Sequence, residues 1–196
     1  MFAGPLLLLC SYVLGSVPFG AVIAGLKGVD LKKIGSGNIG ATNVLRGVGK
    51  GAALFTLLGD SLKGAVAVVV ARSLGFDALW QGLAGLCAVL GHNFSVFLGG
   101  RGGKGVATSL GVVAVLAPLA ALFAVCCWLA VALLTRFSSL AALVAFALLP
   151  LFILGTGGKG PVVSVAAALT LLILLRHLGN IKRLLGGRER KIGEKI

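Results

Sequence analysis

Long apolar runs, separated by short clusters of glycine and basic residues, make up most of this 196-residue sequence. The runs cover residues 1–25, 51–71, 78–100, 105–135, 137–158 and 160–175. A helix that crosses a hydrocarbon core of about 30 Å needs roughly 20 apolar residues, with about 17 to 25 as the usual range. Within the second run the only charged residues are Asp60 and Lys63. The pattern therefore predicts a bundle of transmembrane helices.

The run 105–135 is too long for one transmembrane helix. Its 31 uncharged residues would form a helix of about 46 Å at about 1.5 Å per residue. Pro118 lies inside this run, and a proline removes a backbone donor and breaks a helix. We therefore expect two spans here, the first of them short and close to 106–117, and seven spans in total.

The positions of lysine and arginine predict the orientation of these spans. With seven spans and an external N-terminus, only Arg72 and Lys159 among the loop and tail cations fall outside. Cytoplasmic loops are enriched in lysine and arginine. A count of six would place the basic tail on the opposite side from the first basic loop. We expect an all-α integral membrane protein with its N-terminus outside and its C-terminus in the cytoplasm.

Composition supports one transmembrane domain over residues 1–196. Hydrophobic residues make up 58% of the chain and charged residues 12%, which is far from the composition of soluble domains. The net charge of +13 does not indicate nucleic-acid binding, because the basic residues punctuate apolar runs and form no single basic face. The four cysteines lie inside apolar runs without metal-ligand spacing, so neither a disulfide framework nor a zinc site is expected.

The first cytoplasmic loop combines glycines with hydrogen-bond donors. Gly35, Gly37 and Gly40 match the spacing of the dinucleotide fingerprint, but that motif requires a preceding strand and a βαβ unit. Glycines also let backbone N–H groups converge on an anion, which would make this loop a phosphate-binding loop. The alternative is that the loop is a flexible connector between two helices. We expect a phosphate site whose contacts are Ser36, Gly37, Asn38, Gly40, Thr42, Asn43 and Arg46.

The second cytoplasmic loop, residues 99–105, is also rich in glycine and carries Arg101 and Lys104. It does not match the P-loop pattern, because Gly105 follows Lys104 where a serine or threonine is required. Backbone amides, one lysine and the dipole of the short helix that follows can still bind a phosphate. A tight turn with topogenic charges is the alternative. The predicted contacts are Gly102, Gly103, Lys104, Gly105 and Thr108.

Polar residues inside the spans must be paired. Asp60 and Lys63 lie three residues apart on one helix face, and a charge facing lipid costs at least about 2.5 kcal/mol. We interpret them as a structural ion pair directed into the bundle. His92, in the third span, is expected to form a hydrogen bond within the bundle. Ser139 follows the fifth span and is predicted to contact the substrate, with an interfacial anchor as the alternative.

His177 and Asn180 follow the last span and lie three residues apart, so they can share one helix face. Their place at the cytoplasmic rim, beside Arg176, favours a role in the site.

Three sequence motifs together indicate a family. They are SGNIGATN at 36–43, GHNFSVF at 91–97 leading to GGKGVAT at 102–108, and HLGNIKR at 177–183. Together they resemble the acyl-phosphate-dependent glycerol-3-phosphate acyltransferases of bacteria, the PlsY family. The resemblance covers nearly the whole chain, with Ser95 where the family usually has proline.

The resemblance implies transfer of a fatty acyl group from acyl-phosphate to the 1-hydroxyl of glycerol 3-phosphate, which gives lysophosphatidic acid and phosphate. The partners would be these two substrates and membrane lipid, at the cytoplasmic face of the bacterial inner membrane. We assign catalytic roles to His177, Asn180 and Lys104, with His177 as the general base or as the group that orients the hydroxyl. The acceptor's own phosphate, with a second pKa near about 6, is the alternative base.

Neither histidine is followed by an aspartate five residues later, so the His-x4-Asp motif of other glycerol-phosphate acyltransferases is missing. The five carboxylates are scattered along the chain, and we expect chemistry without a metal or another cofactor. The competing function is a transporter for a phosphorylated anion, since basic loops beside short helices can line a pathway. The sequence contains no evident inverted repeat to support that alternative.

Overall fold

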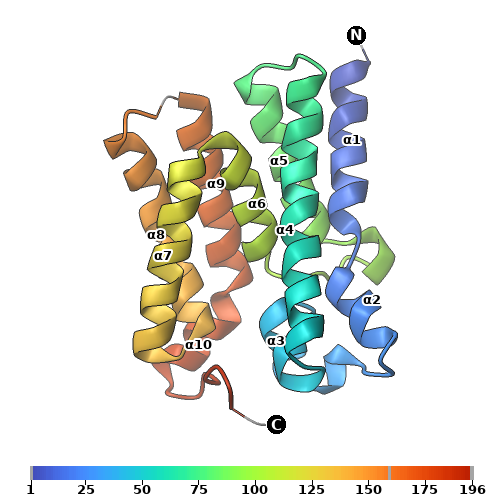
Figure 1. Ribbon diagram of the computed structural model, residues 1–196, viewed down its shortest axis with the longest axis vertical. Helices are drawn as coiled ribbons and strands as arrows, with labels where there is room; N and C mark the ends of the chain where they lie inside the picture. Colours follow the sequence, from blue (N-terminus) through green and yellow to red (C-terminus); the bar gives the residue numbers. More distant parts are fainter. Residues whose placement is uncertain (1, 159, 195–196) are drawn as a thin grey trace.

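The computed structural model describes residues 2–158 and 160–194, and every regular element in this part is a helix (Figure 1). The predicted all-α class is confirmed, while Lys159 lies outside the described residues. The α-helices are α1 (Ala3–Ser16), α2 (Phe19–Gly25), α3 (Ala41–Gly47), α4 (Lys50–Ser73), α5 (Ala78–Asn93), α6 (Val106–Leu116), α7 (Pro118–Thr135), α8 (Ser138–Gly155), α9 (Gly160–Arg176) and α10 (Leu178–Leu185). Two short 3-10 turns, η1 (Leu31–Lys33) and η2 (Val96–Leu98), lie in the loops.

Five helical stretches of the described chain are long and apolar enough to cross a membrane. They are Ala3–Gly25, Lys50–Ser73, Ala78–Leu98, Pro118–Thr135 and Ser138–Gly155. α9 and α10 together pass the same test but bend by 59° between them. α6, the expected short fourth span, has 11 residues, fewer than a full crossing requires. The count of seven spans and their orientation therefore remain predictions.

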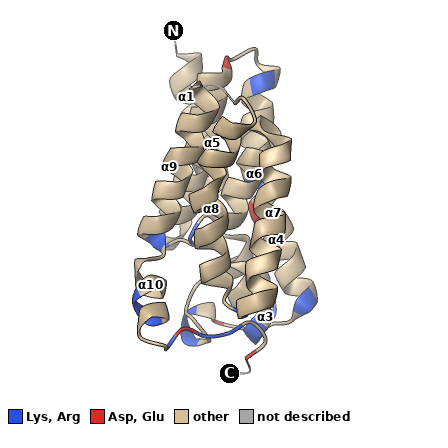
Figure 2. Ribbon diagram, turned by 90° about the vertical axis from the view of Figure 1, so that its left-hand side faces the viewer, with Lys and Arg blue, Asp and Glu red and all other residues tan. Residues whose placement is uncertain are grey.

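The helices form two groups, which are joined through α6 and through a direct contact of α5 with α9. α1, α4 and α5 lie on one side and α7, α8 and α9 on the other, with α2, α3 and α10 at the end where the chain terminates (Figure 1). α6 contacts α4 and α5 in the first group and α7 in the second. Figure 2 shows lysine and arginine gathered mainly at the end that holds α3 and α10.

Small residues allow the helices of the first group to pack closely. A Cβ added at Gly91 in α5 would collide with the backbone oxygen of Tyr12 in α1, and one added at Gly64 in α4 would collide with the backbone oxygen of Thr108 in α6. Lipid offers no hydrophobic drive between helices, so close backbone packing is a main source of attraction there. Large apolar side chains such as Leu133 and Leu134 point outward, as expected for a surface that faces lipid.

The run 1–25 forms two helices and not the single helix that its composition predicts. Pro18 has no N–H to donate, and the helix breaks at Val17 and Pro18. The break leaves two carbonyl groups that find partners elsewhere: Ser95 Oγ donates to Ser16 O at 2.5 Å, and Lys63 Nζ donates to Val17 O at 2.8 Å. The Ser95 hydroxyl therefore satisfies one of the carbonyl groups that the break leaves free.

The run 105–135 divides at Ala117, directly before Pro118. α6 has 11 residues and α7 has 18, which correspond to about 16 Å and about 27 Å of helix. Ala117 joins the two helices, which pack against each other as α7 runs back alongside α6 (Figure 1). The loop before α6 is consequently recessed in the bundle, deeper than the loop that follows α7.

Candidate active site

A cavity of about 340 Å³ lies between the two helix groups and extends to the end that carries the basic residues. Its polar lining comes mainly from loops and helix ends, and comprises Ser36, Asn38, Thr42, Asn43, Arg46, Asp60, His92, Lys104, Ser138, Ser139, His177, Asn180, Glu189 and Arg190. Its apolar lining comes from α4, α6, α7 and α8, and includes Leu57, Leu110, Val125, Trp128, Leu129 and Phe146. One cavity therefore offers both a basic region and an apolar wall.

Most of the residues predicted for the site line this cavity. They are Ser36, Asn38, Gly40, Thr42, Asn43, Arg46, Lys104, Gly105, Ser139, His177 and Asn180. Four predicted residues do not line it, namely Gly37, Gly102, Gly103 and Thr108. The tertiary structure thus brings together residues from the first loop and α3, from the second loop, from α8, and from the start of α10 with its N-cap His177.

The first loop is held in shape by its own side chains. The Asn43 amide donates to the carbonyls of Leu31 (3.2 Å), Ile34 (3.2 Å) and Asn38 (2.8 Å), and its Oδ1 accepts from the backbone N–H of Ser36 at 2.9 Å. Asn43 is thus a scaffold residue of the loop.

Several backbone amides of the first loop are already used within it. Gly40 N–H donates to Asn38 Oδ1 at 2.9 Å, and Gly37 N–H donates to the Ile34 carbonyl at 2.9 Å. The expected cradle of free amides at Ser36, Gly37 and Gly40 is therefore not present, because the loop itself uses these donors. The side chains of Ser36, Thr42 and Arg46 remain on the cavity wall.

The second loop differs from its prediction in the same way. Gly102 N–H donates to the Asn93 carbonyl at 3.2 Å, and Gly103 N–H donates to the His92 carbonyl at 3.0 Å. The Arg176 guanidinium donates to the carbonyls of both glycines at 3.0 to 3.1 Å. Both amides donate to carbonyls at the end of α5 and are not free for phosphate. The loop residues that line the cavity are Lys104 and Gly105. Thr108 is buried where α6 packs against α4.

Lys104 forms no ion pair with the carboxylates that the structure describes. In the described part of the chain, no carboxylate lies within the 4.0 Å that defines an ion pair with its Nζ. Burial lowers the pKa of Lys104 to about 8, and the neighbouring Arg183, Arg46 and Arg176 act in the same direction while Glu189 opposes them. A partly buried ammonium without a partner is a natural contact for a phosphate oxygen.

His177 lies between α9 and α10, and its side chain is buried. Its Nδ1 is 2.8 Å from the Ile173 carbonyl, which can only accept, so Nδ1 carries the proton and Nε2 is an acceptor. Burial lowers the pKa of His177 to about 4, and the nearby charge of Lys104 contributes. The imidazole is therefore neutral at physiological pH.

Glu189 is a residue of the cavity that the sequence prediction missed. Its carboxylate accepts hydrogen bonds from Ser139 Oγ (2.8 Å), Asn180 Nδ2 (2.6 Å) and Arg183 Nε (2.8 Å). Burial raises the pKa of Glu189, but these hydrogen bonds and the charge of Arg183 outweigh it and hold the pKa below its usual value. An acid within the basic stretch 182–191 was the available signal.

The tail that carries Glu189 folds over the basic region of the cavity. The Arg46 guanidinium donates to the carbonyls of Arg190 and Lys191 at 3.2 Å, and Ile192 N–H donates to the Arg136 carbonyl at 2.7 Å. Burial lowers the pKa of Arg46 while Glu189 opposes the shift. The tail thus joins α3, the end of α7 and the start of α10 across the site.

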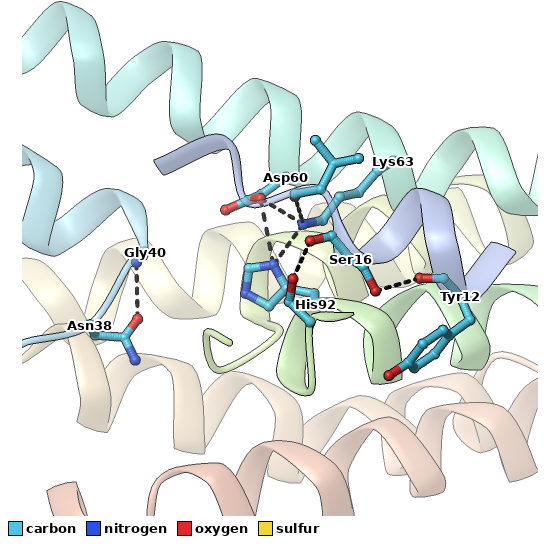
Figure 3. A network of polar contacts seen from close by, with 9 residues as sticks. Tyr12, Ser16, Asn38, Gly40, Asp60, Lys63 and His92 are labelled. Atoms are coloured by element: carbon cyan, nitrogen blue, oxygen red, sulfur yellow. Dashed lines mark hydrogen bonds and ion pairs between the residues drawn. The ribbon is translucent and has the colours of Figure 1, made fainter. Parts of the chain in front are cut away.

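A buried polar cluster forms another part of the cavity wall (Figure 3). Lys63 Nζ lies 2.9 Å from Asp60 Oδ1 and 2.8 Å from His92 Nδ1, while His92 Nδ1 lies 3.5 Å from Asp60 Oδ1. Asp60 and His92 line the cavity, whereas the sequence indicated only a hydrogen bond inside the bundle for His92. Within residues 2–158 and 160–194 no three His, Cys, Asp or Glu side chains are grouped as metal ligands would be.

Comparison with known proteins places the chain among glycerol-phosphate enzymes. The family model described as glycerol-3-phosphate acyltransferase matches residues 5–187. A glycerol-3-phosphate acyltransferase of Aromatoleum aromaticum is 52% identical over 189 residues, covering 96% of each chain. One from a Jannaschia species is 55% identical over 188 residues, covering 95% of this chain and 91% of the relative.

Two crystal structures of PlsY (YgiH), described as an integral membrane glycerol 3-phosphate acyltransferase, share this fold. The glycerol 3-phosphate form has a TM-score of 0.93 and 45% identity, covering 97% of this chain and 96% of that one. The lysophosphatidic acid form has a TM-score of 0.91 and 44% identity over the same shares. The family resemblance found in the sequence is confirmed, and the chain belongs to the glycerol-3-phosphate acyltransferase family.

Proposed function

We propose that this protein transfers a fatty acyl group from acyl-phosphate to the 1-hydroxyl of glycerol 3-phosphate, the first step of phospholipid synthesis. The observation that carries the proposal is the double character of the cavity, in which Lys104 and Arg46 share one space with an apolar wall from α6, α7 and α8. A phosphate requires cations and hydrogen-bond donors. A fatty acyl chain requires an apolar surface, and a single cavity provides both.

The reaction needs positioning and charge stabilisation more than a covalent catalyst, because an acyl-phosphate is already activated. The hydroxyl oxygen attacks the acyl carbonyl carbon, the bond from that carbon to the phosphate oxygen breaks, and inorganic phosphate leaves. In this proposal Arg46 and Lys104 hold the two phosphates, and Asn180 and Ser139 contact glycerol 3-phosphate. Preorganised donors of this kind are most effective in a site that excludes water.

Two groups can take the proton of the attacking hydroxyl, namely His177 and the phosphate group of glycerol 3-phosphate. A phosphate monoester has a second pKa near about 6, whereas the pKa of His177 is lowered to about 4. The phosphate is therefore the stronger base at neutral pH. His177 then orients the hydroxyl through its Nε2, and the acceptor phosphate receives the proton.

The site faces the cytoplasm in this proposal, and the chain crosses the bacterial inner membrane seven times. The basic residues gathered around α3 and α10 support this orientation (Figure 2), because lysine and arginine are enriched on the cytoplasmic side. Glycerol 3-phosphate then enters from the cytoplasm. The acyl donor and the lysophosphatidic acid product exchange with the membrane along the apolar wall.

An assay of the purified protein in detergent tests the reaction. We expect acyl-phosphate and glycerol 3-phosphate to give equal amounts of lysophosphatidic acid and inorganic phosphate, with a doubly substituted Arg46→Ala, Lys104→Ala protein as the inactive control. Acyl-CoA in place of acyl-phosphate should give no product, and excess EDTA should leave the rate unchanged. Activity with acyl-CoA alone, or a rate restored by a divalent ion after chelation, would contradict the proposal.

A further inference from the structure

His92 is buried beside the cavity, and its contacts with Lys63 determine where its proton lies. The ammonium of Lys63 has three N–H groups and no lone pair. Its three close neighbours are Val17 O at 2.8 Å, Asp60 Oδ1 at 2.9 Å and His92 Nδ1 at 2.8 Å. The charged lysine therefore donates to His92 Nδ1, and the neutral ring carries its proton on Nε2.

Among the residues that the structure describes, the one hydrogen bond of the His92 side chain is at Nδ1, and no acceptor lies within hydrogen-bond distance of its Nε2. Figure 3 shows this nitrogen on the side of the ring towards Asn38 and Gly40, two residues that line the same cavity as His92. Gly103 packs against Nε2 so closely that an added Cβ would collide with it. The loop that carries Lys104 thus rests on the imidazole of His92, a residue of the cavity lining.

The second histidine of the chain has the opposite arrangement. His177 donates from Nδ1 to the Ile173 carbonyl, so its Nε2 is an acceptor, whereas His92 accepts at Nδ1 and donates from Nε2. The two imidazoles line one cavity. One therefore offers a lone pair to a hydroxyl, and the other offers a proton to an oxyanion.

We propose that His92 is a second functional histidine, whose Nε2–H donates to a phosphate oxygen of the bound substrate, and that Asp60 and Lys63 are a positioning pair that fixes its tautomer. This inference rests on the proposed function, because it assumes a phosphate in the cavity. A neutral donor held in a buried site stabilises the charge that develops on a leaving phosphate. The Asp60–Lys63 pair, which the sequence indicated was structural, then also directs the donor.

Nuclear magnetic resonance of the full-length protein labelled with 15N-histidine reads the tautomers directly, since the chain has only two histidines. We expect one imidazole protonated at Nε2 and one at Nδ1, and a His177→Asn protein should retain only the Nε2-protonated signal. Addition of inorganic phosphate, the leaving group of the proposed reaction, should shift the His92 Nε2 resonance. Protonation of His92 at Nδ1, or a resonance unmoved by saturating inorganic phosphate, would overturn the proposal.

Kinetics of matched variants separate donation from packing. His92→Gln keeps an amide donor near the place of Nε2, whereas His92→Leu keeps bulk alone. We expect His92→Leu to lower turnover by about 100-fold to 1,000-fold, and His92→Gln to retain at least about tenfold more activity than His92→Leu. Near-normal turnover of His92→Leu, or equal losses in two proteins of unchanged thermal stability, would contradict the donor role.

The positioning pair is tested by replacing both charges together as Asp60→Asn, Lys63→Met, which leaves no lone buried charge. We expect the proton of His92 to redistribute between its two nitrogens, and turnover to fall in parallel. An unchanged tautomer with unchanged turnover would remove the positioning role. Wild-type protein that fails to transfer an acyl group from acyl-phosphate defeats the proposed function by itself, while the tautomers and the phosphate-induced shift remain measurable.

Discussion

Lys104 and His177 are both driven towards their neutral forms by burial, with opposite consequences for the site. The pKa of Lys104 falls to about 8, so the lysine is still mostly charged at neutral pH and can bind phosphate. The pKa of His177 falls to about 4, so the histidine is uncharged and can accept a hydrogen bond. The same desolvation therefore yields one cation and one neutral acceptor.

Lys104 should set an alkaline limit on activity. As the pH rises through about 8, the free enzyme loses the ammonium, and kcat/KM for glycerol 3-phosphate should fall about tenfold per pH unit. Lys104→Arg should remove this limb, because a guanidinium keeps its proton. Lys104→Ala should lower kcat/KM by roughly 30-fold to 1,000-fold at pH 7. An unchanged alkaline limb in the Lys104→Arg protein would assign the titration to another group.

His177 should affect the rate without setting the acidic limb of the pH profile. His177→Ala should lower turnover by about 100-fold, because a misplaced hydroxyl reacts slowly. If the acceptor phosphate takes the proton, the acidic limb near about pH 6 belongs to the substrate and should persist in the variant. Loss of that limb in His177→Ala would identify His177 as the base, and measurement of kcat and kcat/KM across pH distinguishes the two outcomes.

At the scale of helices, contacts between backbones position the site. α4 carries the Asp60–Lys63 pair and packs on α6 through Gly64, and α6 begins directly after the Lys104 loop. α5 carries His92, and its last carbonyls receive the amides of Gly102 and Gly103. A shift of α4 against α6 would therefore move the lysine loop relative to the buried cluster.

The fit at Gly64 should be visible in stability. Gly64→Ala places a Cβ against the Thr108 backbone oxygen, and we expect a loss of about 1 to 3 kcal/mol in the free energy of unfolding. Gly51→Ala is the matched control in the same helix, because nothing lies within 4 Å of an added Cβ there, and it should be neutral or slightly stabilising. Thermal unfolding in detergent compares the two proteins, and equal melting temperatures would contradict the packing argument.

At the scale of the whole molecule, charge and apolar surface are separated along the bundle axis. Basic residues gather mainly at the end with α3 and α10 (Figure 2), while leucine and valine side chains cover the outer surface of the helices. The cavity extends from that basic end to a wall of residues from α6, α7 and α8. This arrangement suits the proposed reaction, in which a water-soluble phosphate meets a membrane-soluble acyl chain.

Topology reporters test the orientation of the complete chain. A reporter joined to the C-terminal end should be cytoplasmic and one joined to the N-terminal end external, because seven spans put the termini on opposite sides and the basic loops belong inside. A cysteine placed in the loop between α4 and α5 should react with an external, membrane-impermeant reagent. Both termini on one side would make the count of spans even and defeat the seven-span proposal.

The sequence by itself determined the helical class, the apolar stretches and the family. These follow from local composition and from motifs of a few consecutive residues, which can be recognised without knowledge of distant contacts. It also indicated most of the polar residues around the cavity, because Lys104, His177 and Asn180 stand in compact motifs beside helix ends.

Only the tertiary structure decided which donors are free. The amides of Gly102 and Gly103 donate to carbonyls at the end of α5. Glu189 accepts from Ser139, 50 residues away in the sequence, and His92 Nδ1 lies 2.8 Å from Lys63 Nζ of another helix. A hydrogen bond joins one donor to one acceptor, and the two groups can lie far apart in the sequence. Local pattern therefore predicts that a group is polar, whereas the packing of helices determines whether it binds the protein or a substrate.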